Sequence, residues 1–130
     1  MNGNSIALDT NIAVHVLNGV PEVVQFLGTF AQLCLPVPVI GELRYGALNS
    51  ARPAPNLERV ERLLARCRPL LADVATAEAY ARIRFDLKRQ GTPIPENDIW
   101  IAAVCVQYNL TLVTNDHHFG NVNGLGIARP

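Results

Sequence analysis

The sequence alternates short apolar runs with longer segments whose apolar residues recur at helical spacing, and this alternation limits the folds open to the chain. Five short segments are predicted to be strands: residues 5–8, 34–36, 70–74, 110–113 and, more weakly, 126–128. Strands that are separated by helices pair in parallel, because a parallel pair needs a crossover connection. Helices then cover both faces of the sheet. The expected fold class is therefore α/β, in three layers.

The spacing of apolar residues predicts helices between these strands, the first of them opening at Thr10 and Asn11. The others span residues 23–33, 39–48, 57–67, 75–90 and 95–108. The middle of the last segment is apolar on all sides, which predicts a helix buried among other elements. Open parallel sheets bind ligands beyond the carboxyl ends of their strands, so residues that end a strand or begin the next helix are the first to consider for function.

The length of 130 residues fits one domain spanning residues 1–130, without internal repeats or low-complexity segments. The longest uninterrupted apolar run, residues 99–106, has eight residues, whereas a helix that spans a bilayer needs about 20. Asp9 interrupts the only hydrophobic stretch near the N-terminus, so a secretory signal is not expected. The expected location is the cytoplasm, without a membrane partner.

Positive charge is concentrated in the middle of the chain, although the formal net charge is zero. Residues 44–89 hold ten of the eleven Lys and Arg residues but only five of the eleven acids. A basic middle beside an acidic remainder suits a protein that attracts a polyanion to one face and holds metal ions in a pocket on another. Solvated helix faces give the same distribution, and on charge alone they are the preferred interpretation.

Cysteine and histidine spacing does not favour a zinc site. Cys34, Cys67 and Cys105 lie far apart and are expected to be reduced core thiols. His15 stands alone, and the adjacent His117 and His118 would point in different directions. Each histidine is therefore expected to be structural or to face solvent.

Four acids fall where an α/β sheet binds its ligands: Asp9, Glu42, Asp98 and Asp116. Taken singly, Asp9 is explained by helix capping, Asp98 by the helix dipole in a first turn, and Asp116 by a loop. Glu42 is different, because it interrupts an apolar run that is otherwise fit for burial. A nearly buried acid needs a partner or a metal ion.

Carboxylates that converge on one pocket need a counter-charge, because two like charges about 4 Å apart repel by about 4 kcal/mol at an effective dielectric constant of about 20. No Lys or Arg lies within ten positions of Asp9 or Asp116, and Arg44 is the one beside Glu42 that could fold back. A divalent cation fits better, and oxygen ligands favour Mg²⁺ or Mn²⁺ over zinc.

At this point the sequence resembles PIN-domain proteins, and among them the VapC ribonuclease toxins of bacterial toxin–antitoxin pairs. The resemblance covers nearly the whole chain. Its landmarks are residues 8–11 (LDTN), 39–47 (VIGELRYGA), 97–103 (NDIWIAA) and 112–116 (LVTND), followed by Phe119. Each landmark is a weak signal alone, but their common order and spacing are specific.

The resemblance implies a PIN-like three-layer α/β/α sandwich with a central parallel five-stranded sheet. It implies RNA hydrolysis, a homodimer, and inhibition by a cognate VapB-type antitoxin whose C-terminal segment covers the groove. It also implies a Mg²⁺ or Mn²⁺ site formed by the four acids. Asp9 and Asp98 would be ligands, Asp116 would complete the set, and Glu42 would bind a second ion or position water.

Three neighbouring polar residues would support this site. Asn115 competes with Asp116 for the position that faces the metal, because the family varies at this turn. Thr10 and Thr114 match positions whose hydroxyls orient the site, although helix capping explains Thr10 equally well. The bound metal would lower the pKa of its water, so that no protein nucleophile is required.

Other functions are less consistent with the sequence. A phospho-aspartate enzyme or receiver domain needs a lysine near the phosphate, and the only lysine, Lys88, lies inside a predicted helix. A nucleotide-binding fold lacks its Gly-rich loop, since none follows a predicted strand. The non-enzymatic alternative is a catalytically inactive PIN-like module that binds RNA or protein, and the presence of all four acids argues against it.

Overall fold

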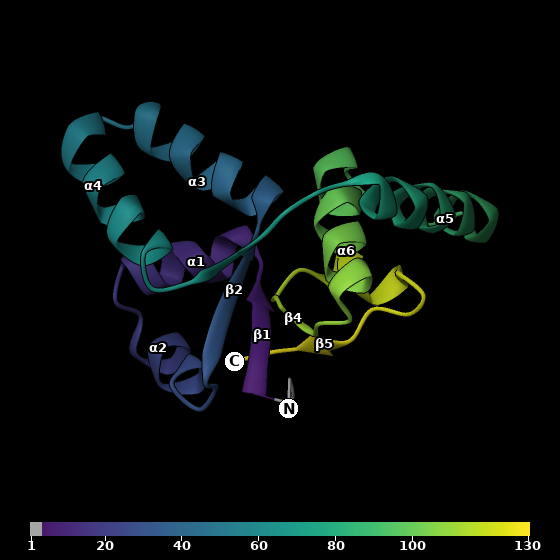
Figure 1. The fold of residues 1–130 in the computed structure, drawn as a ribbon, viewed down its shortest axis with the longest axis horizontal. Coiled ribbons are helices and arrows are strands. Elements are labelled where there is room, and N and C mark those ends of the chain that lie inside the picture. The colour runs from purple at the N-terminus through teal and green to yellow at the C-terminus, as the bar shows by residue number, and fades with distance from the viewer. Residues whose placement is uncertain (1–3) are drawn as a thin grey trace.

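The computed structural model describes residues 4–130 and contains a five-stranded sheet (Figure 1). Its strands lie in the order β3-β2-β1-β4-β5, and every neighbouring pair is parallel. The strands are β1 (Ser5–Leu8), β2 (Gln32–Pro36), β3 (Arg68–Leu70), β4 (Leu112–Val113) and β5 (Ile127–Ala128). The predicted α/β class and the parallel five-stranded sheet are therefore confirmed.

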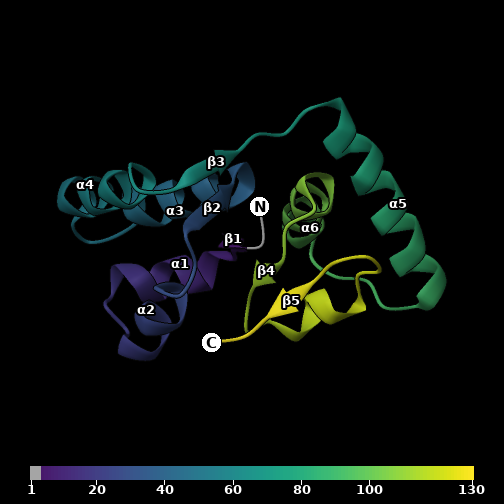
Figure 2. The same ribbon diagram turned by 60° about the horizontal axis from the view of Figure 1, so that its bottom comes forward.

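The helices divide into two groups, one on each face of the sheet. They are α1 (Thr10–Leu17), α2 (Pro21–Leu27), α3 (Val37–Leu48), α4 (Pro53–Leu64), α5 (Val74–Gln90) and α6 (Glu96–Tyr108). The chain moves outward from β1 to β2 to β3 through α1–α4, then returns through α5 and α6 to β4 on the other side of β1. Crossovers are right-handed, so reversing the direction of travel puts α5 and α6 on the opposite face (Figure 2).

The core centres on α6, as the apolar sequence of this helix predicts. Residues 101–105 are fully buried, and Ala102 and Ala103 let neighbouring elements approach closely. Cys34 and Cys105 are buried free thiols, and Cys67 is a half-buried one. Over residues 4–130, no helix has both the length and the apolar character that a membrane crossing requires.

The predicted helix over residues 23–33 is too long, because α2 ends at Leu27 and Gly28 forms its C-cap. The segment after residue 31 belongs to the sheet instead, where Leu33 pairs with Ile6 and Cys34 with Ala7. Sequence periodicity does not separate these alternatives, because a short apolar run suits a buried strand as well as a helix.

The elements around β3 also differ from the prediction. The helix expected over residues 57–67 begins at Pro53, whose fixed φ suits a first helical turn, and ends at Leu64. The strand expected over residues 70–74 lies earlier in the chain. It is β3 (Arg68–Leu70), which contains Pro69. Proline lacks a backbone donor and is tolerated there because β3 is an edge strand. Asp73, assigned to that strand from the sequence, is the N-cap of α5.

Candidate metal and catalytic site

The predicted acids gather where the sheet changes its direction of winding, between β1 and β4. The register pairs Leu8 with Val113, so the residues that follow, Asp9 and Thr114, leave the sheet side by side. The backbone N–H of Asp9 donates to the Val113 carbonyl at 3.0 Å. Such a switch point leaves a crevice at the carboxyl ends of the strands, because the flanking helices depart to opposite faces.

Asp9 is the most constrained acid of the site, with only 6% of its surface exposed. One carboxylate oxygen accepts the backbone N–H of Thr10 at 2.8 Å, and the other accepts the Thr114 hydroxyl at 2.7 Å. Burial raises the pKa of Asp9; these hydrogen bonds oppose the rise, and the charges of Asp116 and Glu42 add to it. The hydrogen bonds to Asp9 therefore do not fully compensate the cost of burying its negative charge.

Glu42 reaches this site through a threonine. It lies in α3, and its carboxylate accepts a hydrogen bond from the Thr10 hydroxyl, while the Thr10 backbone binds Asp9. Thr10 therefore links the two acids. Arg44 does not fold back onto Glu42, because its guanidinium forms a two-pronged ion pair with Glu61 at 2.9 and 3.0 Å.

Asp98 and Asp116 meet on the other side of Asp9, together with His118. Within the described part of the chain, these three side chains form the one group whose ligand atoms all lie within 4.8 Å of one another. Burial raises the pKa of Asp98, and the charges of Asp9 and Asp116 raise it further, whereas His118 lowers it. Asp9 and Glu42 are not members of this tighter group.

A short 3₁₀ helix, η2 (His117–Asn121), positions Asp116 and His118. Asp116 is its N-cap: the carboxylate accepts the backbone N–H of His118 at 2.9 Å. The backbone N–H of Asp116 donates to the Thr114 hydroxyl at 2.9 Å, and that hydroxyl in turn donates to Asp9. Thr114, which is fully buried, thereby fixes the spacing of the two acids.

His118 is the member of the site that sequence reasoning missed. It is exposed to solvent, as expected, but its Nδ1 lies 3.1 Å from Asp116 and 3.5 Å from Asp98. The signal in the sequence was the spacing Asp116-x-His118 at the start of a turn, which is too short a pattern to be specific. Asn115 is exposed and lines a cavity of about 350 Å³ together with Asp9, Asn11, Val14, His15 and Asp116.

These residues fit a divalent cation. The pKa values of Asp9 and Asp98 are raised, and among the ion pairs of residues 4–130 no Lys or Arg neutralises any of the four acids. A cluster of carboxylates without a cationic partner is stabilised by an ion of charge two. The oxygen donors suit a hard cation, and the imidazole of His118 adds one nitrogen donor.

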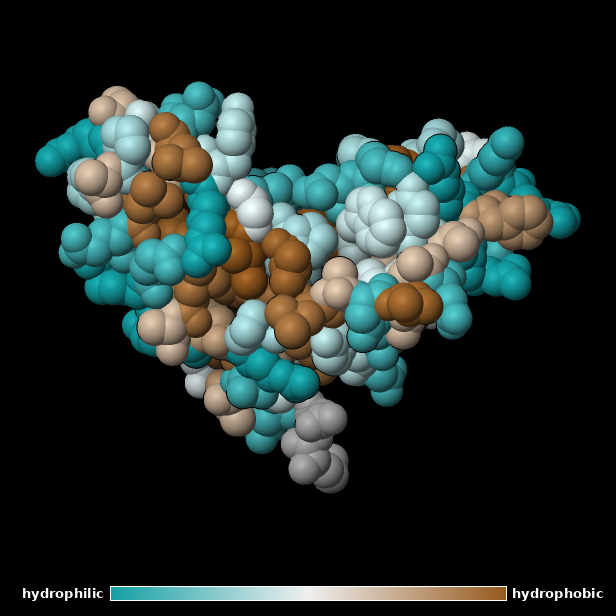
Figure 3. All heavy atoms as spheres, turned by 45° about the horizontal axis from the view of Figure 1, so that its top comes forward, coloured by the Kyte–Doolittle hydropathy of each residue, from teal (hydrophilic) through white to brown (hydrophobic). Residues whose placement is uncertain are grey.

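Two further hollows flank the site without containing its acid cluster. One, of about 240 Å³, lies among α1, α3 and α4, with Glu42 at its edge and the side chains of Val14, Leu17 and Val60 in its wall. Figure 3 shows hydrophobic side chains gathered over the middle of this face.

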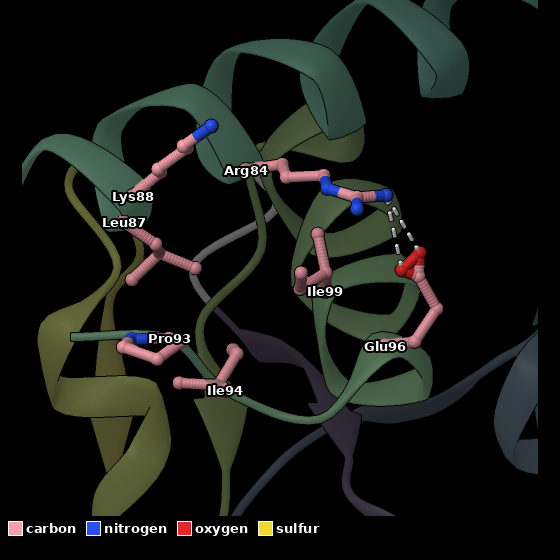
Figure 4. Close-up of a pocket in the computed structure, with 7 residues that line it drawn as sticks. All are labelled: Arg84, Leu87, Lys88, Pro93, Ile94, Glu96 and Ile99. Atoms are coloured by element: carbon pink, nitrogen blue, oxygen red, sulfur yellow. Dashed lines mark hydrogen bonds and ion pairs between the residues drawn. The ribbon is translucent and has the colours of Figure 1, made fainter. Parts of the chain in front are cut away.

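The second hollow, of about 370 Å³, lies between α5 and α6 (Figure 4). Ile94, Ile99 and Leu87 supply its apolar wall, and Arg84 pairs with Glu96 across its mouth at 3.2 Å. None of the four acids lines it, so it offers no comparable metal chemistry.

Comparison with known proteins agrees with this geometry. Residues 6–125 match the PIN domain family. Ribonuclease VapC2 of Haemophilus influenzae is 35% identical over 113 residues, which cover 84% of each protein. The tRNA(fMet)-specific endonuclease VapC of Shigella flexneri is 35% identical over 121 residues, covering 91% of this chain and 92% of that protein.

Solved structures show the same likeness in three dimensions. VapBC2 from Rickettsia felis, determined bound to a DNA fragment from its promoter, superposes with a TM-score of 0.91 at 27% identity. The superposition covers 97% of this chain and 98% of that one. By sequence and by fold, the chain belongs to the PIN-domain family.

Proposed function

We propose that the chain is a metal-dependent endoribonuclease of the VapC type, which hydrolyses RNA phosphodiester bonds by attack of water. The observation that carries the proposal is the grouping of Asp98 and Asp116 at the switch point of a PIN-domain sheet, close to the buried Asp9. Thr114 links Asp9 to Asp116, and Thr10 links Asp9 to Glu42. The names of two relatives support the activity: one is a ribonuclease and the other an endonuclease specific for tRNA(fMet).

In this mechanism Asp9, Asp98 and Asp116 would hold the ion, which would be Mg²⁺ or Mn²⁺. When bound, a divalent cation supplies positive charge opposite the phosphate and lowers the pKa of water. Glu42 orients the attacking water, since its carboxylate is held by Thr10 beside Asp9. Thr114 keeps the Asp9 carboxylate in place and, through the backbone of Asp116, sets the distance between two ligands.

The same proposal includes regulation by a VapB-type antitoxin, because a related chain is found in a complex named VapBC2. The groove lined by Glu42 suits an antitoxin segment, since its wall combines apolar side chains with one acid of the site and with Arg59. Among the apolar residues of α1 and α4, Val60 and Leu63 belong to the core, whereas Val14 remains 37% exposed.

Homodimerisation in the cytoplasm completes the proposal. Large hydrophobic side chains remain exposed on helices from both faces of the sheet. They include Tyr45 and Leu48 of α3 and Val74 and Phe85 of α5. Exposed apolar surface is typical of protein interfaces. A second copy of the chain would cover one of these two groups.

A cleavage assay with Asp98→Asn tests the proposed function. The substitution removes one ligand charge at nearly constant size, so cleavage of RNA in Mg²⁺ should fall at least about 100-fold while circular dichroism stays unchanged. Substrates should include tRNA(fMet) and an unstructured RNA, each with metal and with EDTA. Glu96→Gln is the matched control, because Glu96 lies in the same helical turn but pairs with Arg84 at the surface. Full cleavage by Asp98→Asn, or cleavage in EDTA, would overturn the proposal.

A further inference from the structure

We propose that His118 is a ligand of the catalytic metal ion, and that its nitrogen makes the site select Mn²⁺ over Mg²⁺. This inference rests on the proposed function, because it concerns the same site. Its starting point is the tight group of Asp98, Asp116 and His118, whose ligand atoms lie within 4.8 Å of one another. The Nδ1 atom of His118 faces the carboxylates of both Asp98 and Asp116.

The distances around His118 are those of neighbouring ligands on one ion. Around an octahedral ion with ligands at about 2.1 Å, two adjacent ligands lie about 3.0 Å apart and two opposite ligands lie about 4.2 Å apart. His118 Nδ1 is 3.1 Å from Asp116 Oδ1 and 3.5 Å from Asp98 Oδ2, so both separations approach an octahedral edge. Small side-chain rotations would let all three atoms meet one ion.

The turn that carries His118 is anchored on both sides. The backbone N–H of His118 donates to the Asp116 carboxylate, and the next residue, Phe119, is fully buried in the core. The ring is therefore delivered to the acids from a fixed backbone. Its side chain stays 49% exposed, which leaves it free to rotate toward an ion. His117 is also exposed but is absent from the ligand group.

Nitrogen ligation discriminates between the two ions that the acids would accept. Mg²⁺ is a hard cation that prefers oxygen and retains several waters, so an imidazole adds little to its binding. Transition-metal ions accept imidazole readily, and Mn²⁺ is the member of that series that also suits carboxylates in octahedral geometry. The contribution of His118 should therefore appear in Mn²⁺ affinity and be nearly absent for Mg²⁺.

Calorimetric titration of the metal-free protein with Mn²⁺ alone and with Mg²⁺ alone tests this selectivity. His118→Asn should weaken Mn²⁺ binding by on the order of 10–100-fold, the usual effect of disturbing a metal's ligand environment, and Mg²⁺ binding by less than about threefold. His117→Asn is the matched control and should leave both affinities unchanged. Equal changes for the two ions, or no change for either, would overturn the inference, because His118 would then act only through charge or not at all.

A spectroscopic measurement on the unaltered protein is independent of any folding defect in a variant. Electron-nuclear double resonance of bound Mn²⁺ should show coupling to a nitrogen, and the coupling should change isotope pattern when histidine is labelled with ¹⁵N. The signal should vanish in His118→Asn. It should persist in the control His15→Asn, which removes the histidine that lines the cavity beside Asp9 and Asp116.

The two proposals fail in different ways. Mn²⁺ binding without nitrogen coupling would overturn the role of His118 and leave the nuclease proposal standing, provided that Asp98→Asn still abolishes cleavage. Absence of binding for both ions in the unaltered protein would overturn both.

Discussion

At the scale of single residues, Asp9 shows how the site opposes the stability of the fold that contains it. Burial raises the pKa of this carboxyl above its ordinary value of 3.8, so the fold favours the protonated form. The resulting stabilisation is fully present below the pKa of the unfolded chain and is lost as the pH rises through the raised pKa of the folded one. The metal-free protein therefore bears the cost of a buried charge at neutral pH.

Asp9→Asn should accordingly raise the melting temperature of the metal-free protein at pH 7 by several degrees, since 1 kcal/mol shifts the Tm of a domain of this size by roughly 3–5 °C. The gain should shrink as the pH falls through the raised pKa of Asp9, because protonation then neutralises the carboxyl itself. Melting curves of both proteins in EDTA across pH 4–8 measure the difference. A difference that did not depend on pH would show that the effect comes from packing and not from the charge of Asp9.

Thr114→Val should destabilise the protein by about 1–3 kcal/mol, because the fully buried hydroxyl serves both the Asp9 carboxylate and the Asp116 N–H. Valine has a similar shape but satisfies neither group. Urea unfolding measures the free energy of unfolding of Thr114→Val. The control is Thr111→Val, a change at a half-buried threonine just before β4. Equal stability of the two variants would mean that the Thr114 hydroxyl does not connect the acids as described.

The sequence indicated the chemical identity of the site better than its arrangement. Asp9, Asp98 and Asp116 could be found because they follow strands or begin a buried helix, where open sheets bind ligands. The roles of Thr10 and Thr114 as connectors depend on which strands are neighbours, and β1 and β4 are separated by most of the chain. His118 could not be found, since its contacts depend on a single turn of η2.

At the scale of elements, the helices with strong terminal signals are the ones whose limits could be predicted. Helix α5 has Asp73 at its N-cap in a capping box with Thr76, and Gly91 ends it at a φ of 72°. The predicted range of residues 75–90 agrees closely with Val74–Gln90. Helix α2 lacks a side-chain cap, and its predicted end was wrong.

Asp73→Ala should lower the stability of the protein by about 1–2 kcal/mol, because it removes the N-cap of α5 and the carboxylate that accepts from Gln107 at 2.7 Å. RNA cleavage at low temperature should stay unchanged, since α5 supplies none of the proposed ligands. Asp86→Ala, within the same helix, is the control for loss of an acid away from the cap. A drop in cleavage without a drop in stability would contradict this separation of roles.

At the scale of the whole molecule, the core and the acid cluster are separable. The apolar core is continuous without the acids, so chelation should not unfold the protein. Saturating Mg²⁺ or Mn²⁺ should raise the Tm, because an ion that binds only the folded state stabilises it by mass action, by about 2.7 kcal/mol at 100 times its Kd. Calorimetry with EDTA, then with millimolar metal, measures both effects. An unchanged Tm at millimolar metal would contradict a clustered site.

The hydrogen bond between Thr114 and Asp9 joins residues 105 positions apart, and this separation determines when during synthesis the site can exist. Asp9 leaves the ribosome long before Asp98, β4 and Asp116 do. A nascent chain, or a fragment cut short before β4, therefore lacks both Thr114 and Asp116, and its acid cluster is incomplete. An enzyme that attacks RNA would thus be unable to assemble its site on the ribosome that is making it until β4 and the turn after it have been synthesised.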